Sequence, residues 1–172
     1  MEGGVAQAAA DLDVIRSVVH LIRHAHAGDR AAWTGDDALR PLSEKGWRQA
    51  RGLVELLPRD PRLRRVVSSP SLRCVQTVEP LAEAYALRVE EDDRLLEGAD
   101  PRDALALVEA ELARGDAVAA CSHGDVVPGV LELLMQRDEV SFADRLIWQK
   151  GSTWVLEGDE KGVVRARYLP PP

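Results

Sequence analysis

Short apolar runs alternate with helical repeats along most of this chain. Each run is short enough to form a buried strand, and between the runs apolar residues recur every three or four positions, as in amphipathic helices. The expected strands lie at residues 17–22, 66–67, 87–89 and 117–121. The expected helices lie at residues 43–57, 71–84, 100–115 and about 125–135.

Residues at the ends of these repeats support the boundaries. Ser43 and Asp100 are of the types that cap helix N-termini, and Pro101 stands at the favoured first helical position. Gly115 is typical of a helix C-terminus. Pro80 lies inside the second repeat, where it predicts a bend or an early end of the helix.

The loops and the C-terminal part of the chain show other patterns. Residues 153–156 and 163–168 flank a Gly-bounded polar segment at 158–162, which predicts a β-hairpin. Residues 170–172 are all proline and are expected to fray. Residues 25–42 have no apolar period and are expected to form a loop over the edge of the sheet.

Strands that alternate with helices imply βαβ units and a mainly parallel sheet with helices on both faces. The sequence therefore predicts an α/β fold, a three-layer α/β/α sandwich with a C-terminal antiparallel hairpin. Residues 1–15 are rich in Ala, Gly and Asp and are expected to form a loose N-terminal tail. Residues 16–172 are expected to form a single domain.

Composition and charge narrow the classes of partner. The chain is 45% hydrophobic and carries a net charge of −7, which argues against a surface for a nucleic acid polymer or an anionic membrane. No apolar run approaches the ~20 residues that span a bilayer, and the N-terminus lacks a secretory pattern, so a cytoplasmic protein is expected. Cys74 and Cys121 lack zinc-ligand spacing and are expected to be small buried thiols.

The candidate chemistry lies where three strands end in polar residues. Arg23 and His24 follow the first strand, a Ser-Ser-Pro turn leads to Arg73, and a Ser-His-Gly sequence contains His123. Carboxyl ends of parallel strands share one edge of the sheet, so we expect these arginines and histidines in one pocket. Guanidinium groups bind phosphate, and a neutral imidazole can attack phosphorus to form a phosphohistidine without a metal.

Two other chemistries use similar residues. His24 and His26 fit an H-x-H metal pair, but Arg23 beside them would repel a cation, and hydrolases with that pair usually need a longer barrel. A cysteine phosphatase needs an arginine six positions after its cysteine, where Pro80 and Val127 stand instead. We therefore favour the phosphohistidine mechanism and expect His26 in an exposed loop.

Four motifs resemble those of the histidine phosphatase superfamily, also called the phosphoglycerate mutase-like family. They are Arg-His-Ala at residues 23–25, Leu-Ser-Glu-Lys-Gly-Trp-Arg-Gln-Ala at 42–50, Ser-Ser-Pro-Ser-Leu-Arg-Cys-Val-Gln-Thr at 68–77 and Ser-His-Gly at 122–124. Ala25 replaces the usual glycine of the first motif, as in smaller members that resemble bacterial phosphohistidine phosphatases.

The resemblance implies a role for each site residue. His24 would be the phosphoacceptor. The phosphate pocket would consist of Arg23, Arg73 and His123, with no metal or other cofactor. Glu97, in a Leu-Leu-Glu context, matches the general acid of one branch of the family, although it could simply extend the solvated acidic run before it.

The remaining sequence bears on the substrate. Only 45 residues separate Thr77 from His123, where mutases and broad acid phosphatases place a larger cap, so we expect an open, shallow site. Such a site suits a phosphoprotein or an extended nucleotide, and Arg30 could contact either. Residues 33–42 also resemble the histidine phosphatase domain fused to some actinobacterial Nudix hydrolases, which indicates nucleotides.

The predicted function is a metal-independent phosphatase that hydrolyses a phosphohistidine protein or a small phosphate ester through a phosphohistidine at His24. A nucleotide or sugar phosphatase of the same family is one alternative. A module that recognises a phosphorylated partner without turnover is another, and the complete set of two arginines and two histidines argues against it.

Overall fold

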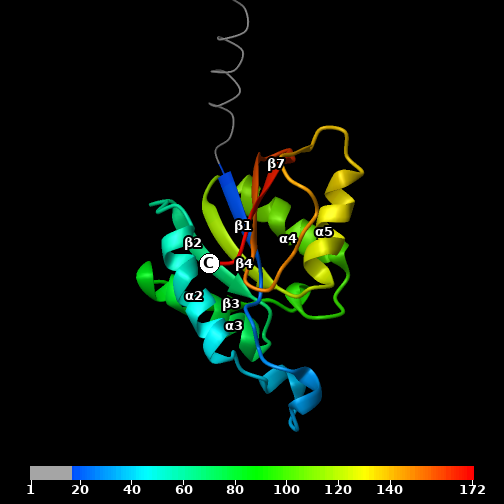
Figure 1. The fold of residues 1–172 in the computed structure, drawn as a ribbon. Coiled ribbons are helices and arrows are strands. Elements are labelled where there is room, and N and C mark those ends of the chain that lie inside the picture. The colour runs from blue at the N-terminus through cyan, green and yellow to red at the C-terminus, as the bar shows by residue number, and fades with distance from the viewer. Residues whose placement is uncertain (1–16) are drawn as a thin grey trace, which may run out of the picture.

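The computed structural model describes residues 17–172, where strands and helices alternate as predicted (Figure 1). The strands are β1 (Ser17–Arg23), β2 (Leu63–Ser68), β3 (Val89–Glu91), β4 (Ala117–Ser122), β5 (Ser141–Phe142), β6 (Thr153–Asp159) and β7 (Gly162–Leu169). The helices are α2 (Glu44–Leu56), α3 (Leu72–Ala84), α4 (Pro101–Ala113) and α5 (Val126–Met135), with short 3-10 turns η1 (Arg30–Ala32), η2 (Asp37–Leu39) and η3 (Asp93–Leu95). The tail predicted over residues 1–15 lies outside the described residues.

The described strands form one sheet in the order β3-β2-β4-β1-β6-β7-β5. The first four are parallel to one another, while β6 runs antiparallel to β1 and forms the predicted hairpin with β7. β5, which was not predicted, adds a short parallel pairing to the outer side of β7. The mainly parallel sheet with a C-terminal antiparallel hairpin is thus confirmed.

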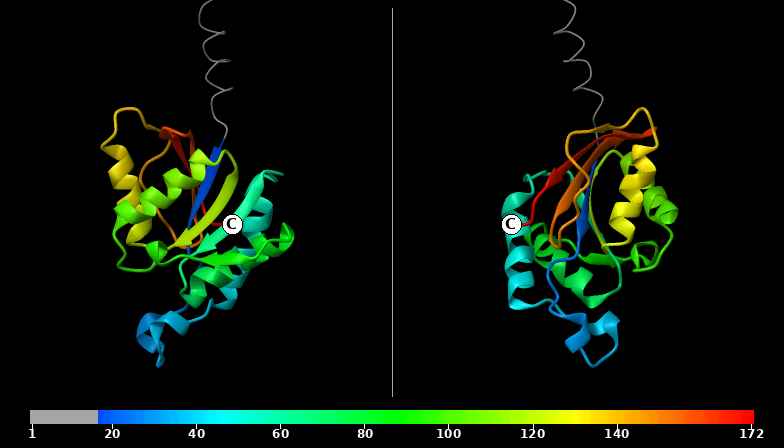
Figure 2. Two further views of the ribbon diagram at one scale, coloured as in Figure 1. Left: turned by 180° about the vertical axis from the view of Figure 1, so that it is seen from behind. Right: turned by 45° about the vertical axis from the view of Figure 1, so that its right-hand side comes forward.

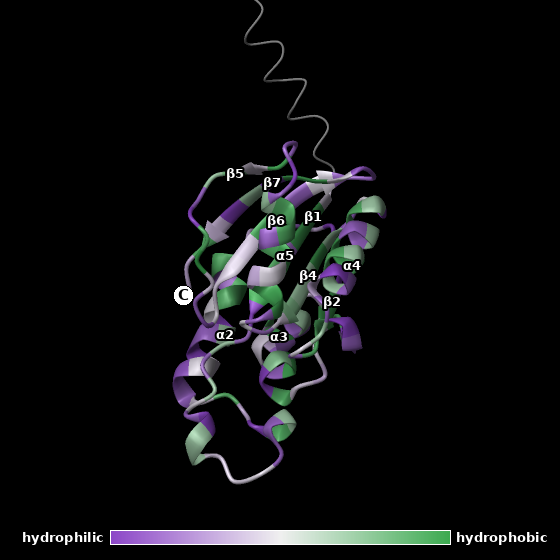
Figure 3. Cartoon of the chain, turned by 90° about the vertical axis from the view of Figure 1, so that its right-hand side faces the viewer, coloured by the Kyte–Doolittle hydropathy of each residue, from purple (hydrophilic) through white to green (hydrophobic). Residues whose placement is uncertain are grey.

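Helices cover both faces of this sheet (Figure 2). α2 and α3 pack on one face through residues such as Leu53 and Val78, and α4 and α5 pack on the other through Leu107 and Leu131. α5 is coloured mainly as hydrophobic, whereas α2 shows a largely hydrophilic exterior (Figure 3). Burial of these faces is the main contribution to stability, and it confirms the three-layer architecture.

The predicted helix ends are confirmed, and the early end that Pro80 predicted for its helix is wrong. Ser43 caps α2 by accepting a 3.1 Å hydrogen bond from the Gly46 amide, and Asp100 caps α4. α3 continues past Pro80 to Ala84 because the turn after the proline carries Leu81, which is buried in the core. Packing of this last turn outweighs the missing backbone donor.

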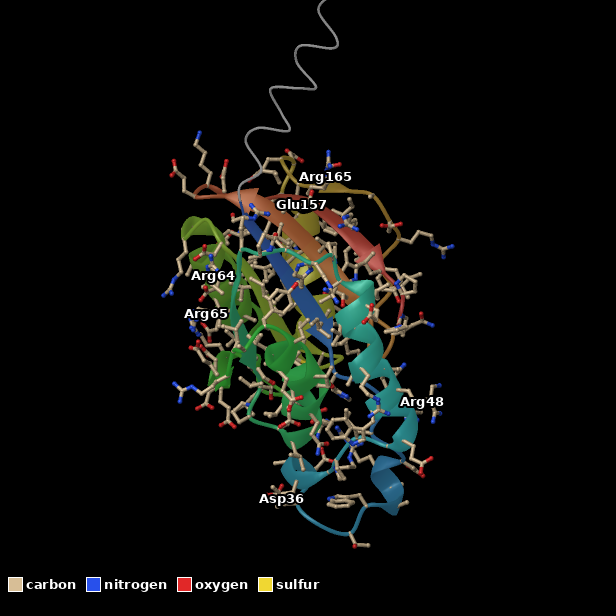
Figure 4. All side chains as sticks on the ribbon, turned by 90° about the vertical axis from the view of Figure 1, so that its left-hand side faces the viewer. Asp36, Arg48, Arg64, Arg65, Glu157 and Arg165 are labelled. Atoms are coloured by element: carbon tan, nitrogen blue, oxygen red, sulfur yellow. The ribbon has the colours of Figure 1, made fainter. Side chains whose placement is uncertain are left out.

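Three further boundaries differ from the prediction. β2 begins at Leu63 rather than at residue 66. Arg65 within it, labelled in Figure 4, forms ion pairs with Glu90 of β3 and Glu111 of α4. β3 covers residues 89–91 instead of 87–89 because Val89 is the residue that pairs with β2. The C-terminus is not frayed, since Pro172 packs against α2 where Gly52 leaves room for it.

Residues 28–42 project beyond the carboxyl ends of the parallel strands, and we call this segment the 28–42 lobe (Figure 1). Two 3-10 turns, η1 and η2, give it local order, and Asp36 lies near its far end (Figure 4). Most of its side chains are exposed, so the lobe stands beside the sheet edge where the predicted site residues gather. Within the described residues, no helix is both long and apolar enough to cross a membrane.

Candidate active site

The sheet brings the predicted site residues to one edge. β1 lies beside β4 with Arg23 opposite Ser122, and β2 lies on the other side of β4, so the three strand ends are neighbours. The rings of His24 and His123 are 5.4 Å apart between centroids. A cavity of about 350 Å³, lined by Arg23, His24, Arg30 and Glu97 among others, opens at this edge.

His24 is buried and has a defined tautomer. Its Nδ1 lies 2.8 Å from the carbonyl oxygen of Ala25, an acceptor, so the proton resides on Nδ1 and the lone pair on Nε2. Burial, opposed by this hydrogen bond and reinforced by His123 and the two nearby arginines, lowers the pKa of His24 to about 3. The imidazole is therefore neutral at pH 7 and available as a nucleophile.

Arg23 is fixed against backbone on two sides. Its Nη1 donates a 2.7 Å hydrogen bond to the carbonyl of Trp148. A Cβ at Gly124 would lie 2.6 Å from Nη2, which explains why a glycine follows His123. Burial lowers the pKa of Arg23, and the Asp125 carboxylate opposes that effect.

Arg73 is only 1% exposed and reaches the site from the first turn of α3. It donates through Nη1 to the Asp37 carbonyl at 2.8 Å, and its Nη2 lies 3.2 Å from the carboxylates of Asp37 and Glu97. The buried Nε atoms of Arg23 and Arg73 have no acceptor within residues 17–172. Buried donors without acceptors are rare, and a bound anion would satisfy them.

His123 is held by the Ser-Ser-Pro turn. Its Nε2 lies 2.8 Å from Ser69 Oγ, and its Nδ1 lies 3.4 Å from Nη2 of Arg73. The adjacent Ser122 hydroxyl donates to the Leu95 carbonyl at 2.7 Å. The serines of these two motifs thus position His123 rather than face the cavity themselves.

Glu97 and Arg30 lie at the mouth of the cavity. Arg30 donates two hydrogen bonds, of 2.7 and 3.0 Å, to the Glu97 carboxylate, which also contacts Arg73. Glu97 therefore belongs to the site rather than to the solvated acidic run before it. Its role as an acid, like the nucleophilic role of His24, stays a prediction.

Several charged residues at this edge were not predicted. Arg40 is buried, donates to Asp37 Oδ1 at 2.8 Å and to the Ala27 carbonyl at 2.7 Å, and lines the cavity. Lys150 also lines it, and burial, reinforced by Arg23 and Arg40, lowers the pKa of Lys150. Its neighbour Gly151 donates its amide to the carbonyl oxygens of Arg23 and His24.

Lys150 reaches the site because of topology. The antiparallel β6 begins beside the end of β1, so the residues just before β6 lie next to His24. A prediction that the C-terminal hairpin pairs with β1 would also have placed Lys150 at the site. No pattern in the sequence of the 28–42 lobe predicts that Asp37 and Arg40 lie at the site.

Other motif residues build the loop that follows His24. The Ala25 amide donates to Thr77 Oγ1, and the His26 amide donates to Gln49 Oε1, each at 2.9 Å. His26 Nδ1 lies 2.7 Å from Ser43 Oγ, so the expectation of an exposed His26 is wrong. The loop folds back on the N-terminus of α2, and this contact partly buries the ring.

Within residues 17–172, no group of three or more His, Cys, Asp or Glu side chains is placed to hold a metal ion. His24 and His26 each direct Nδ1 to a separate oxygen, so the H-x-H pair has no third ligand among the described residues. Cys74 and Cys121 are buried free thiols, as predicted.

Comparisons with known proteins agree with this geometry. Residues 19–99 match the model of the histidine phosphatase superfamily (branch 1). A curated relative from Mycolicibacterium smegmatis, named 8-oxo-(d)GTP phosphatase, is 35% identical over 158 residues, which cover 90% of this chain and 48% of the relative. The chain thus spans about half the length of that relative.

Solved structures share the fold. The protein histidine phosphatase SixA, complexed with tungstate, superimposes with a TM-score of 0.67 at 22% identity, covering 89% of this chain and 94% of SixA. A Nakamurella multipartitia protein, provisionally named phosphohistidine phosphatase SixA, gives a TM-score of 0.69 at 26% identity, covering 90% and 96% of the two chains. The motifs, the fold and these matches together show that the chain is similar to members of the histidine phosphatase superfamily, branch 1.

Proposed function

We propose that this protein is a metal-independent phosphatase in which His24 forms a phosphohistidine. The supporting observation is the neutral His24 imidazole, whose Nε2 lone pair is free beside Arg23, Arg73 and His123. Nε2 attacks phosphorus, and the bond to the leaving oxygen breaks with its electron pair remaining on that oxygen. The arginines stabilise the charge on the equatorial oxygens.

Water then completes the cycle. It attacks the phosphoryl group, the P–N bond breaks, and the electron pair returns to Nε2 as inorganic phosphate forms. Glu97 protonates the leaving oxygen in the first step and accepts a proton from water in the second. Because both Arg30 and Arg73 contact Glu97 in the structure, a substrate whose phosphates bind both arginines would free this carboxylate for proton transfer.

We propose a nucleotide as the substrate. The cavity is lined by four cationic side chains, Arg23, Arg30, Arg40 and Lys150, against the two carboxylates of Glu97 and Asp125, and Arg73 adds a further cation behind it. This excess of positive charge suits a substrate with a second phosphate, and the 35% identical relative bears the name 8-oxo-(d)GTP phosphatase.

A phosphohistidine protein is the second candidate. The fold shared with the SixA structures and the short segment between α3 and β4 favour it, since a protein substrate needs an open approach. An imidazole leaving group needs less acid assistance than an alkoxide, so a dispensable Glu97 would support this substrate.

The test is a substrate panel with a trapping experiment. We expect the wild type to hydrolyse an aryl phosphate in excess chelator and to prefer nucleotides over a phosphohistidine protein and sugar phosphates. Rapid quenching should trap an acid-labile radiolabelled phosphoprotein, which His24→Ala abolishes and His26→Asn retains. Trapped label in His24→Ala would overturn the assignment, and binding without turnover by the wild type would support a recognition module instead.

A further inference from the structure

A second cavity of about 270 Å³ lies beside the first, between the base of the 28–42 lobe and the start of α2. Gly28 and Arg40 line both cavities, so the two are adjacent. The walls of the second cavity are largely apolar and include Ala32, Trp33 and Leu42. Nothing in the proposed phosphoryl chemistry uses this space.

Trp33 is the distinctive residue of the second cavity. Its side chain is among the large hydrophobic groups that stay exposed, at 38%. The indole Nε1 donates to the Asp36 carbonyl at 3.0 Å, and a Cβ at Gly35 would lie 3.3 Å from ring atoms, so the ring is held in place. Trp33 lines the second cavity, whereas Gly35, which packs against its ring, does not.

Gly28 lies on the boundary that the two cavities share and leaves space there. This residue has a φ of 66°, and a Cβ there would meet no atom within 4 Å. Arg40 lies on the same boundary with its guanidinium held by Asp37 and by the Ala27 carbonyl. A ligand that extends from the first cavity into the second therefore passes a fixed cation and then reaches an aromatic surface.

We propose that the second cavity binds the base of a nucleotide whose phosphate lies at His24, with the base against Trp33. The proposal rests on the nucleotide phosphatase function proposed above and adds the site that would select for nucleotides. Stacking on an aromatic ring suits any base. Asp29 is also on the wall; its Oδ1 accepts from the Ala31 amide at 2.9 Å, and the remaining lone pairs of its carboxylate can accept from ring N–H and amino donors, which favours guanine over pyrimidines that lack this donor pair.

The test compares substrates with and without a base. Trp33→Ala should raise KM for guanosine diphosphate about 5- to 150-fold, the range expected from the loss of one stacked base. KM for ribose 5-phosphate, which lacks the base, should stay within about twofold, as should kcat for both substrates. Trp33→Phe keeps an aromatic face and should retain most of the affinity.

Leu39→Ala is the matched control. Leu39 is another exposed hydrophobic residue of the lobe, at 62%, and it lines neither cavity, so both KM values should stay unchanged. Unchanged KM for guanosine diphosphate in Trp33→Ala, or equal increases for both substrates, would overturn the base site.

Direct binding separates this proposal from the proposed function. Calorimetry with guanosine diphosphate and the inactive His24→Ala variant should show binding that is weakened in the His24→Ala/Trp33→Ala double variant. If the wild type does not hydrolyse nucleotides but this Trp33-dependent binding is present, the base site stands and the nucleotide phosphatase function fails. If nucleotides are hydrolysed but Trp33 has no effect on binding, the base site fails alone.

Discussion

Arg73 combines charge, burial and geometry in one residue, and each can be tested separately. Its guanidinium is almost completely buried, and its Nη atoms contact Asp37 and Glu97. A planar fork can hold two oxygens of one phosphoryl group, whereas a lysine ammonium acts as a point charge. The shape of Arg73 should therefore matter as well as its charge.

Arg73→Ala should weaken binding of vanadate, a phosphate analogue, by about 10- to 100-fold, the range expected when a charge-assisted hydrogen bond is lost. Arg73→Lys should recover only part of this loss. Titration of vanadate inhibition measures both effects. Arg102→Ala, which removes an exposed arginine paired with Asp100, should change nothing, and equal affinity in wild type and Arg73→Ala would remove Arg73 from the pocket.

Two buried histidines should make stability depend on pH. Burial, with Arg167 adding to it and Asp60 opposing it, lowers the pKa of His20 to about 4, and the pKa of His24 is lowered to about 3. Below the unfolded value of about 6.5, the unfolded chain binds protons that the folded chain does not. Acid therefore favours unfolding through these residues, and their effect vanishes above that pH.

From pH 6.5 down to about 4.5, each of His20 and His24 should lower the free energy of unfolding by up to about 1.4 kcal/mol per pH unit. Carboxylates contribute mainly below this window. Denaturant titrations at several pH values measure the slope. His24→Asn should make it shallower, and an identical slope in this variant would contradict a neutral, buried His24.

At the scale of the elements, α2 and α3 begin differently although both follow a serine. Ser43 caps α2 and also contacts His26, so it joins the helix to the loop that follows His24. Ser71 precedes α3 but makes no capping hydrogen bond through its side chain. The pair provides a matched comparison within one protein.

Ser43→Ala should lower the free energy of unfolding by about 1–2 kcal/mol, as expected for a lost N-cap, and Ser71→Ala by clearly less. Ser43→Ala should also reduce kcat, because the loop that follows His24 loses its contact with Ser43. Chemical denaturation and steady-state kinetics provide the two measurements. Equal destabilisation by both variants would show that the Ser43 cap adds nothing specific.

The sequence predicted the features that depend on neighbouring residues, and it missed those that depend on contacts between distant parts of the chain. Helix caps such as Ser43 and Asp100 act within one turn, so the local sequence predicts them. Arg23, Arg73 and His123 lie inside short motifs, so the motifs identify these site residues directly. β3 was misplaced by two residues because strand pairing, a long-range contact, sets its register. Arg40 and Lys150 reach the site through contacts between distant parts of the chain, and no short sequence pattern predicts such contacts.

At the scale of the whole molecule, β1 lies inside the sheet, with β4 parallel on one side and β6 antiparallel on the other. The 28–42 lobe, by contrast, has mainly exposed side chains and projects from the sheet edge (Figure 1). Arg23 and His24 stand at the junction of these two parts. The free energy of local opening should therefore be much higher for β1, before His24, than for the 28–42 lobe after it.

Hydrogen exchange should resolve this difference. Amides of β1 should exchange only through global unfolding, with protection close to the full free energy of unfolding, whereas amides of the 28–42 lobe should exchange through local opening. Mass spectrometry of peptides from residues 17–23 and 28–42 makes the comparison. Similar protection of both peptides would contradict it.

The position of β1 also bears on how such a protein can diversify. The side chains proposed to act on phosphorus lie at the ends of β1 and β4 and in the first turn of α3. Of the residues proposed to contact the rest of the substrate, Trp33, Arg30 and Arg40 lie in one contiguous lobe that takes no part in the pairing of the strands. We expect that substitutions, insertions or exchange of that lobe leave the sheet intact, so that selection can alter what the protein acts on while the proposed phosphoryl-transfer chemistry is inherited unchanged.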